Sequence, residues 1–395
     1  MSNQTTIAMV AGEASGDLLA SRLLSGLRPQ LPDARMHGIG GPKMAEYGFV
    51  SDWPMEKLSV MGLFEVLAHY REISGIRKQL TQSLLDEKPD VFIGVDAPDF
   101  NLDLEIRLKQ AGIPTMHYIS PSIWAWRGGR IKKIAQAVSH MLVVFPFEEA
   151  IYREAGIPVT YVGHPLAQVI PLEPDMAAAR DELGIAQDAT VITILPGSRM
   201  SEIRHNTEAF ISAAKNLCER DPQLQILVPM VGEKQRAAYI KLIVAAQLDN
   251  VPVLLINGRS HLAIAAANVV LVASGTATLE VALFKKPMVI AYKMMEATWQ
   301  IQKRMGYQPW IGLPNILAKE FVVPEFLQAA ATPEALANAL WRQLTDLPLQ
   351  DQLKQRFTDM HHALLRDTAS ISAQAVLDVI ASHRSMSSSS GSILK

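Results

Sequence analysis

Short runs of apolar residues, rich in β-branched side chains, alternate with helical patterns along the chain. A first set of runs lies at residues 6–12, 91–96, 141–147 and 159–164, and a second set lies at residues 191–199, 224–231, 251–258, 269–275 and 287–293. Continuous apolar strands of this kind are typical of a parallel sheet with helices on both faces. The pattern therefore predicts an α/β fold with two Rossmann-like, doubly wound domains and substrates bound between the two sheets.

A stretch with three prolines and no long strand, residues 165–175, separates the two sets of strands. We expect the N-terminal domain to cover residues 1–168 and the second domain to cover residues 169–335. Residues 336–382 have helical patterns without a strand, and we expect these helices to pack back across the domain seam. The serine-rich end, residues 383–395, has the low complexity of a disordered tail.

Composition narrows the class of protein. A chain of 395 residues is long enough for about two domains, and its 37 basic and 39 acidic residues nearly balance, which disfavours a nucleic-acid partner. Cys218 is the only cysteine of the sequence, so it excludes an intrachain disulfide and a cysteine zinc cluster, and the scattered histidines predict no metal. The N-terminus lacks a signal-peptide pattern, and no apolar run reaches about 18 residues. We expect a cytoplasmic protein that, if it touches a membrane, lies on its surface.

The loop after the apolar run at 269–273 places Ser274, Gly275 and Thr276 where a helix begins. Free N–H groups and the positive end of the helix dipole suit a diphosphate there. Glu280 follows one turn later on an otherwise apolar helix, where its carboxylate can accept hydrogen bonds from ribose hydroxyls. A plain Ser or Thr helix cap, with Glu280 in solvent or beside a lysine, is the competing interpretation.

Residues 194–206 form a second strand-to-helix loop. Ser198 is placed to cap the helix, and Arg199 is placed to point into the crevice, where a guanidinium can neutralise charge on a leaving phosphate. The alternative is a local ion pair between Arg199 and Glu202.

In the first domain, the loop GVDAPDFNL carries Asp96 at the carboxyl end of its strand. A carboxylate within hydrogen-bond reach of a substrate hydroxyl can act as a general base, and we favour that role for Asp96. For Asp99 we favour capping of the following helix.

The stretch GEASGD, residues 12–17, differs from the GxGxxG pattern of dinucleotide sites, and Glu13 would place negative charge where a pyrophosphate should lie. Glu13, Ser15 and Asp17 suit the hydroxyl and amide groups of a sugar instead, with Gly16 allowing a close backbone approach. Helix capping by Ser15 is the competing explanation.

Two further segments combine aromatic or apolar residues with basic ones. Residues 117–136 fit a phosphate-bearing acceptor, an anionic membrane or a solvated basic helix better than single-stranded nucleic acid. Residues 59–80 predict a helix whose apolar stripe is wider than one buried face needs, so the stripe fits either core packing or docking on a membrane. The stripe consists of Leu63, Phe64, Val66, Leu67, Tyr70 and Ile73, and Arg71, Arg77 and Lys78 flank it.

The motifs GEASGD, GVDAPDFNL, HYISPSIWAWR, LPGSR, ASGTATLE and LPNILA occur in this order. From about Ile7 to about Ala381, the chain closely resembles the lipid-A-disaccharide synthase family. The resemblance implies a GT-B glycosyltransferase that joins UDP-2,3-diacylglucosamine to lipid X with inversion, on the cytoplasmic face of the inner membrane of Gram-negative bacteria. The products are UDP and the lipid A disaccharide 1-phosphate. The resemblance implies no metal and no cofactor.

Roles for single residues follow from the same resemblance. It places UDP against Ser274, Gly275, Thr276 and Glu280, with Arg199 near the diphosphate and Asn315 lining the cleft. We also count Ser198, in the same loop as Arg199, among the UDP-binding candidates. It places Glu13, Ser15 and Asp96 on the acceptor side, with Asp96 as the base. It also implies that the acylated substrates require membrane docking, for which we expect the helix at 59–80, and it allows a homodimer with exchanged C-terminal segments.

Two points remain open in the sequence. Gln168 stands where the family pattern has aspartate, so this side chain cannot supply a charged contact there. The alternatives to a synthase are another GT-B-like activity on a UDP-sugar, such as an epimerase or a transferase with a soluble acceptor, and a non-catalytic UDP-sugar sensor. A sensor would have no use for Asp96.

Overall fold

The computed structural model describes residues 4–58, 63–125, 128–305 and 308–392, with side chains described except at 63–70, 297, 301–302, 304–305 and 387–392. The chain forms two compact units. The first unit comprises Met1–Pro165 and Leu364–Lys395, and the second comprises Leu166–Ala363. The division at Pro165 falls inside the stretch where the sequence indicates a linker.

The first unit is built on a seven-stranded sheet with the order β3-β2-β1-β4-β5-β6-β7. All neighbouring strands pair in parallel. The strands are β1 (Thr6–Ala11), β2 (Arg35–Gly40), β3 (Val50–Pro54), β4 (Val91–Val95), β5 (Thr115–Tyr118), β6 (His140–Val143) and β7 (Val159–Tyr161). The central strands β1 and β4 are buried along almost their whole length, which explains their continuous apolar sequences.

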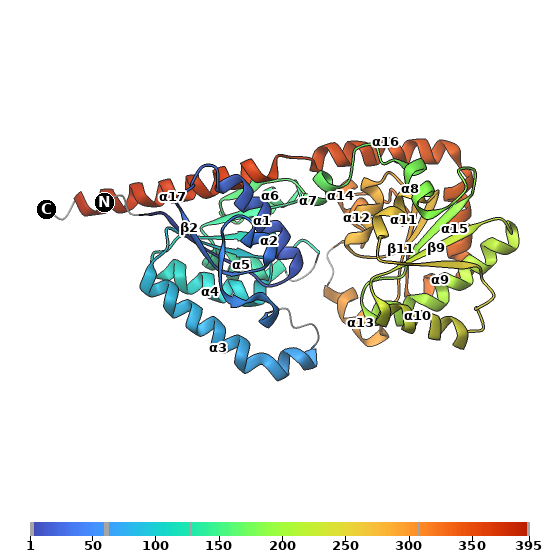
Figure 1. Cartoon of the computed structure of the whole chain (residues 1–395), viewed down its shortest axis with the longest axis horizontal. Helices are drawn as coiled ribbons and strands as arrows, with labels where there is room; N and C mark the ends of the chain where they lie inside the picture. The colour runs from blue at the N-terminus through green and yellow to red at the C-terminus, as the bar shows by residue number, and fades with distance from the viewer. Residues whose placement is uncertain (1–3, 59–62, 126–127, 306–307, 393–395) are drawn as a thin grey trace. The chain divides into compact units, whose positions relative to one another are not determined.

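Helices cover both faces of this sheet, as Figure 1 shows. On one face α3 and α4 pack against apolar side chains of β1 and β4. The helices are α1 (Ala14–Leu27), α2 (Pro42–Ala45), α3 (Leu63–Glu87), α4 (Pro98–Gln110), α5 (Ile131–Ala137) and α6 (Glu148–Glu154), with 3₁₀ turns at Met55–Lys57 and Gly128–Arg130.

The second unit repeats this plan with a six-stranded parallel sheet of order β10-β9-β8-β11-β12-β13. Its strands are β8 (Val191–Leu195), β9 (Gln225–Met230), β10 (Val253–Asn257), β11 (Val269–Ala273), β12 (Met288–Tyr292) and β13 (Glu325–Leu327). The two doubly wound α/β units that the sequence predicts are therefore confirmed.

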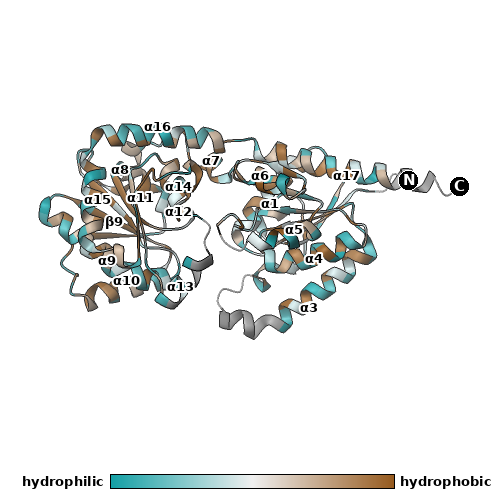
Figure 2. Cartoon of the chain, turned by 180° about the vertical axis from the view of Figure 1, so that it is seen from behind, coloured by the Kyte–Doolittle hydropathy of each residue, from teal (hydrophilic) through white to brown (hydrophobic). Residues whose placement is uncertain are grey.

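The helices of the second unit enclose a core whose apolar strands are brown in Figure 2. The helices are α7 (Pro165–Val169), α8 (Met176–Leu183), α9 (Met200–Arg220), α10 (Glu233–Ala245), α11 (Ser260–Ala266), α12 (Thr276–Leu283), α13 (Glu296–Met305), α14 (Leu313–Ala318), α15 (Pro333–Thr345) and α16 (Leu347–Leu364), with a 3₁₀ turn at Gln328–Ala330. Capping side chains mark where some of them begin: Asp175 accepts a hydrogen bond from the Ala178 N–H, and Thr332 accepts one from the Ala335 N–H.

The C-terminal helices do not form a region of their own. Helices α15 and α16 belong to the second unit, whereas α17 (Thr368–Ser392) belongs to the first and packs along α1. The two helices approach closely at Gly26, where an added Cβ would lie 2.3 Å from the Ala369 carbonyl oxygen. Only glycine fits at this crossing.

The prediction of a disordered tail from residue 383 is wrong for the part that the structure describes, because α17 continues to Ser392. Arg384 lies in this extension and forms an ion pair with Asp90 at 2.8 Å, and it also donates a hydrogen bond to the Thr5 hydroxyl at 3.1 Å. These contacts tie the helix to the start of the sheet. Serine content alone did not reveal them.

The GEASGD stretch begins α1, and its last residue has a structural role. Asp17 is 2% exposed, and its carboxylate accepts hydrogen bonds from the backbone N–H groups of Gly41, Lys43 and Met44 at 3.0, 3.1 and 3.0 Å. The carboxylate therefore caps α2 and is not available to a sugar. The alternative of capping by Ser15 is also wrong, because Glu13 occupies the cap position and makes no side-chain hydrogen bond there.

We predict that Asp17→Ala lowers the free energy of unfolding of the first unit by about 2–3 kcal/mol, because buried N–H donors lose their shared acceptor. Urea unfolding followed by tryptophan fluorescence measures the change. Ser15→Ala, an exposed position on the same helix, is the control and should leave the midpoint unchanged. Equal midpoints for Asp17→Ala and the wild type would contradict the capping role.

Candidate functional site

A cavity of about 280 Å³ lies at the carboxyl ends of β8 and β11 in the second unit. These two strands are neighbours in the middle of the sheet, where the strand order changes direction. Ligands of open α/β sheets bind at such a switch point. The structure brings together here all the predicted donor-side residues except Asn315, namely Ser198, Arg199, Ser274, Gly275, Thr276 and Glu280.

Helix α12 begins at this cavity without a side-chain cap. Its cap position is Gly275, which has a φ of +150° that side chains rarely adopt. The Ser274 hydroxyl donates to the Ile311 carbonyl oxygen at 3.0 Å instead of capping the helix. The alternative of a plain Ser or Thr cap is therefore wrong, and the first N–H groups of α12 are left to a ligand.

Glu280 lines the same cavity and has a partner that the sequence did not reveal. The His261 Nε2 atom lies 3.3 Å from its carboxylate, and both side chains are partly exposed. The His261 ring also packs edge-on against Phe284, with ring centroids 5.3 Å apart. His261 comes from α11, so only the packing of α11 beside α12 could reveal the pair.

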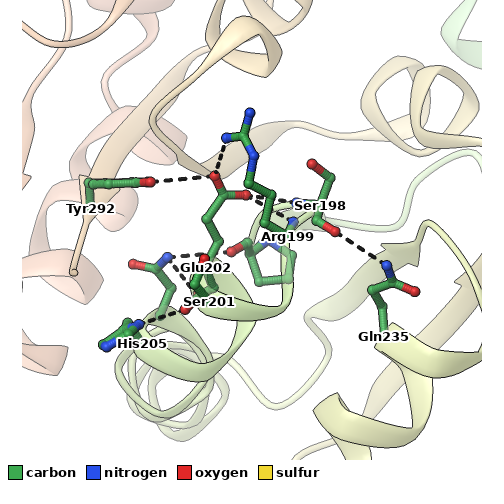
Figure 3. Close-up of polar contacts among 9 residues, drawn as sticks. Ser198, Arg199, Ser201, Glu202, His205, Gln235 and Tyr292 are labelled. Atoms are coloured by element: carbon green, nitrogen blue, oxygen red, sulfur yellow. Dashed lines mark hydrogen bonds and ion pairs between the residues drawn. The ribbon is translucent and has the colours of Figure 1, made fainter. Parts of the chain in front are cut away.

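The loop after β8 is held by the buried carboxylate of Glu202 (Figure 3). The carboxylate accepts hydrogen bonds from the backbone N–H groups of Ser198 and Arg199 at 2.9 and 3.2 Å, and from the Tyr292 hydroxyl at 3.4 Å. Burial and the neighbouring Glu202 raise the pKa of the Tyr292 phenol, which keeps it neutral and able to donate. Ser198 does not cap α9, because the cap position of this helix is Arg199.

Arg199 forms the local ion pair that was the alternative to a phosphate contact. One of its terminal nitrogens lies 3.0 Å from the Glu202 carboxylate. The arginine side chain is nevertheless 72% exposed and lines the cavity. The pair thus holds one edge of the guanidinium in place, while other N–H groups remain directed away from Glu202 for an anion in the cavity.

Asn315 differs from expectation, because it does not line this cavity. It is fully buried, and its amide donates to the Val323 carbonyl oxygen and the Glu325 carboxylate while accepting from the N–H groups of Val322 and Val323. Both donors and both lone pairs of the side chain are in use. The role of Asn315 is to hold the turn before β13. Its side chain could bind UDP only by giving up the hydrogen bonds that hold this turn.

In the first unit, a cavity of about 410 Å³ brings Glu13 and Asp96 together at the ends of β1 and β4. Among the residues that the structure describes, neither carboxylate has a hydrogen bond or ion pair. Asp96 is half-buried and Glu13 is exposed. Ser15 is exposed on the first turn of α1 and does not line the cavity.

The backbone at Asp96 is strained. Asp96 and Ala97 both have left-handed conformations, with φ of +53° and +43°. Such conformations cost about 1–3 kcal/mol each for residues other than glycine. The turn is held because the Asp96 N–H donates to the Tyr118 carbonyl oxygen at 2.9 Å and the Asn101 amide donates to the Asp96 carbonyl oxygen at 2.8 Å. These bonds fix the carboxylate at the end of its strand.

Asp99 has a different role from the expected helix cap. The cap position of α4 is Ala97, and Asp99 lies in the first turn, where its carboxylate forms an ion pair with Arg130. Lys133 pairs with Asp103 of α4 at 2.6 Å. Arg130 and Lys133, the basic side chains of the 117–136 segment for which the structure describes ion pairs, thus both bind carboxylates of α4.

The predicted docking stripe lies mostly outside the described side chains, which leave out Leu63, Phe64, Val66, Leu67 and Tyr70. Its last member, Ile73, is described and is partly buried, which fits the core-packing alternative for this position. Ile73 packs against the core between the sheet and α3 and lines the first-unit cavity. No helix within the described ranges is long and apolar enough to cross a membrane.

Two doubly wound α/β units, each with a cavity at the carboxyl ends of its strands, are the architecture of GT-B glycosyltransferases. A solved glycosyltransferase from Rickettsia africae has this fold, with a TM-score of 0.59 and 12% identity over 96% of this chain and 99% of that one. A UDP-GlcNAc 2-epimerase from Neisseria meningitidis bound to UDP-GlcNAc has it as well, with a TM-score of 0.58 and 12% identity over 96% and 100% of the chains.

Sequence comparison is more specific. The family model described as lipid-A-disaccharide synthetase matches residues 7–379. The lipid-A-disaccharide synthase of Aromatoleum aromaticum is 54% identical, covering 94% of this chain and 95% of its own length, and that of an Azoarcus species is 53% identical, covering 96% and 97%. The chain belongs to the lipid-A-disaccharide synthase family.

One buried carboxyl group outside both cavities has a strongly shifted pKa. Glu148 is 1% exposed, and its carboxyl oxygens accept from the Trp124 ring N–H at 3.1 Å and the Phe145 backbone N–H at 3.0 Å. Burial raises its pKa to about 7, although these hydrogen bonds and one with Ser120 oppose the rise. The folded first unit therefore holds a proton on Glu148 at pH values where the unfolded chain does not.

This shift predicts a pH dependence of stability. Because the pKa is raised on folding, the stabilising proton is fully effective below about pH 4.5 and is lost as the pH rises to about 7, at a cost on the order of 3 kcal/mol. Glu148→Gln, which cannot ionise, should lack this component. Urea midpoints of both proteins between pH 4.5 and 8 measure it, and parallel curves would contradict the shift.

Proposed function

We propose that this enzyme transfers the diacylglucosamine group of UDP-2,3-diacylglucosamine to lipid X, with release of UDP and formation of the lipid A disaccharide 1-phosphate. Membership of the synthase family supports the reaction class. One observation supports placing the acceptor in the first unit and the donor in the second. The first-unit cavity contains two carboxylates without an ion pair, which suit a hydroxyl substrate, whereas the second-unit cavity is suited to an anion.

The second unit would hold the donor. The uncapped start of α12 at Gly275 and the exposed guanidinium of Arg199 are suited to the diphosphate, where they stabilise the charge that develops as UDP leaves. Glu280 is one turn further along α12 and is placed to accept hydrogen bonds from the ribose hydroxyls. In the free enzyme its partner is His261, which the ribose would replace or share.

The first unit would hold the acceptor. Asp96 accepts the proton of the acceptor's primary hydroxyl as that oxygen attacks the anomeric carbon from the face opposite UDP, which inverts the configuration there. The strained turn at Asp96 and Ala97 supports this assignment, because strained backbone of this kind is concentrated at functional sites. Glu13 is placed to accept a hydrogen bond from another acceptor hydroxyl.

A membrane location rests on the substrates and the sequence. Both substrates carry acyl chains, so the enzyme must reach a lipid surface, and we assign that contact to the apolar side chains at 63–70 on the cytoplasmic side of the inner membrane. Ile73 is left out because it is partly buried and packs against the core. Basic residues flank the segment, as on other interfacial helices.

Asp96→Asn is expected to lower turnover by about a hundredfold or more while leaving UDP affinity unchanged, because only proton removal is lost. Mass spectrometry of the disaccharide formed from UDP-diacylglucosamine and lipid X in detergent gives the rate, and calorimetry gives the affinity. Asp86→Asn, an exposed residue near the end of α3, serves as the control. No product from a wild type that binds UDP would sink the synthase proposal, and a fully active Asp96→Asn would exclude the base.

Replacing Phe64, Leu67 and Tyr70 together by serine is expected to release the protein from anionic phospholipid vesicles and to leave its thermal unfolding unchanged. Co-sedimentation measures the binding. The matched control replaces Ile240 and Val244 of α10, which are 41% and 56% exposed, by serine and should bind like the wild type. Unchanged vesicle binding by the triple variant, or its unfolding, would show that these side chains do not dock on lipid.

A further inference from the structure

Arg77 of α3 has no role in the proposed transfer reaction so far, although it lies in the first-unit cavity together with Glu13 and Asp96. It is the only cation among the described residues that line this cavity. Its side chain is 25% exposed, so the guanidinium is neither free in solvent nor sealed in the core.

The guanidinium is held in one place from the side of α4. Its Nη1 atom donates to the Asp103 carboxylate at 3.1 Å and to the Asp99 carbonyl oxygen at 3.2 Å, and its Cζ atom lies 6.0 Å from the centre of the Phe100 ring. Among the described residues, the hydrogen bonds of Arg77 all use Nη1. Nε and Nη2 therefore remain as a fixed pair of donors, which is the geometry that binds a phosphate through two parallel hydrogen bonds.

The other charges of the cavity determine where an anionic group can lie. Three carboxylates line it, of which Asp99 is paired with Arg130, whereas Glu13 and Asp96 have no ion pair among the described residues. A phosphate beside these two would be repelled by like charge, and one beside Arg77 would be attracted. Among the residues that line the cavity, Arg77 is therefore the group that can attract an anion.

We propose that Arg77 binds the phosphate group of the acceptor, an inference that rests on the proposed function because that function supplies a phosphorylated acceptor sugar. With its phosphate on Arg77, the sugar has its opposite end free to reach Asp96. The arginine thereby selects for a phosphorylated acceptor and also determines which hydroxyl meets the base. The ion pair with Asp103 positions the guanidinium for this contact.

A purely structural role is the competing explanation, since Arg77 also joins α3 to α4. The two roles differ in what they do to the preference for a phosphate. A helix clamp affects every acceptor alike, whereas a phosphate contact matters only when the acceptor carries the phosphate. The test therefore compares lipid X with the same diacylglucosamine lacking its phosphate, both measured with UDP-diacylglucosamine as donor.

For the wild type, loss of the phosphate should raise KM by about ten- to a hundredfold, the usual effect of losing a charged hydrogen-bonded pair. Arg77→Gln should raise KM for lipid X by a similar factor and leave KM for the phosphate-free acceptor and kcat almost unchanged, so the preference disappears. Arg77→Lys should keep part of it. Lys78→Gln, an exposed cation next in sequence that does not line this cavity, should keep all of it.

Asp103→Asn provides a second variant that keeps the cation while weakening its anchor, and a reduced but persistent preference is expected. If Arg77→Gln slows transfer to both acceptors equally, or if the wild type shows no preference, Arg77 does not bind the phosphate. Transfer to neither acceptor by a wild type that binds UDP would overturn the proposed function and this inference with it. Transfer with an unaltered preference in Arg77→Gln overturns the inference alone.

Discussion

The carboxyl ends of parallel strands lie along one edge of a sheet, and this constraint decides where chemistry can sit in both units. In the second unit it collects the loops after β8 and β11 around one cavity, and in the first it collects the loops after β1 and β4. Residues far apart in sequence, such as Glu13 and Asp96, line the same cavity because their strands are neighbours in the sheet, although the structure describes no hydrogen bond between the two side chains. The helices and buried strands mainly hold the strand-end loops in fixed positions along that edge.

The two edges use opposite electrostatics. The second unit presents backbone N–H groups and Arg199 to its cavity. The carboxylate of the buried Glu202 there accepts hydrogen bonds from the backbone N–H groups of its loop and forms an ion pair with Arg199. The first unit presents carboxylates and a single cation along its cavity in the part of the chain that the structure describes. A leaving diphosphate needs the N–H groups and the cation of the second unit. A hydroxyl that must lose a proton needs a carboxylate, as in the first unit.

The sequence predicted the doubly wound units, most of their strands and the loops that carry the candidate site, because apolar strand runs and strand-end loops are local signals. It missed β2, β3, β5 and β13, which are short or lack a continuous apolar run. It failed where a side chain bonds to partners that lie outside its own motif. Asp17 and Asn315 look like site residues in their motifs, yet their hydrogen bonds go to backbone segments elsewhere. Ile73 belongs to an apolar stripe whose buried part cannot be told from its exposed part by spacing. Serine-rich composition likewise concealed a helix that Arg384 anchors to Asp90.

The membership of α17 in the first unit has a consequence for how the chain is made. During synthesis, residues 166–363 emerge as one continuous stretch and can complete the second unit before α17 exists. The first unit begins earlier and finishes later, because the face of α1 that contains Gly26 stays uncovered until α17 has been synthesised. The unit whose first strand is made first is therefore the last to be completed, and Asp96 lies in a unit that is finished only when the C-terminal helix has been added.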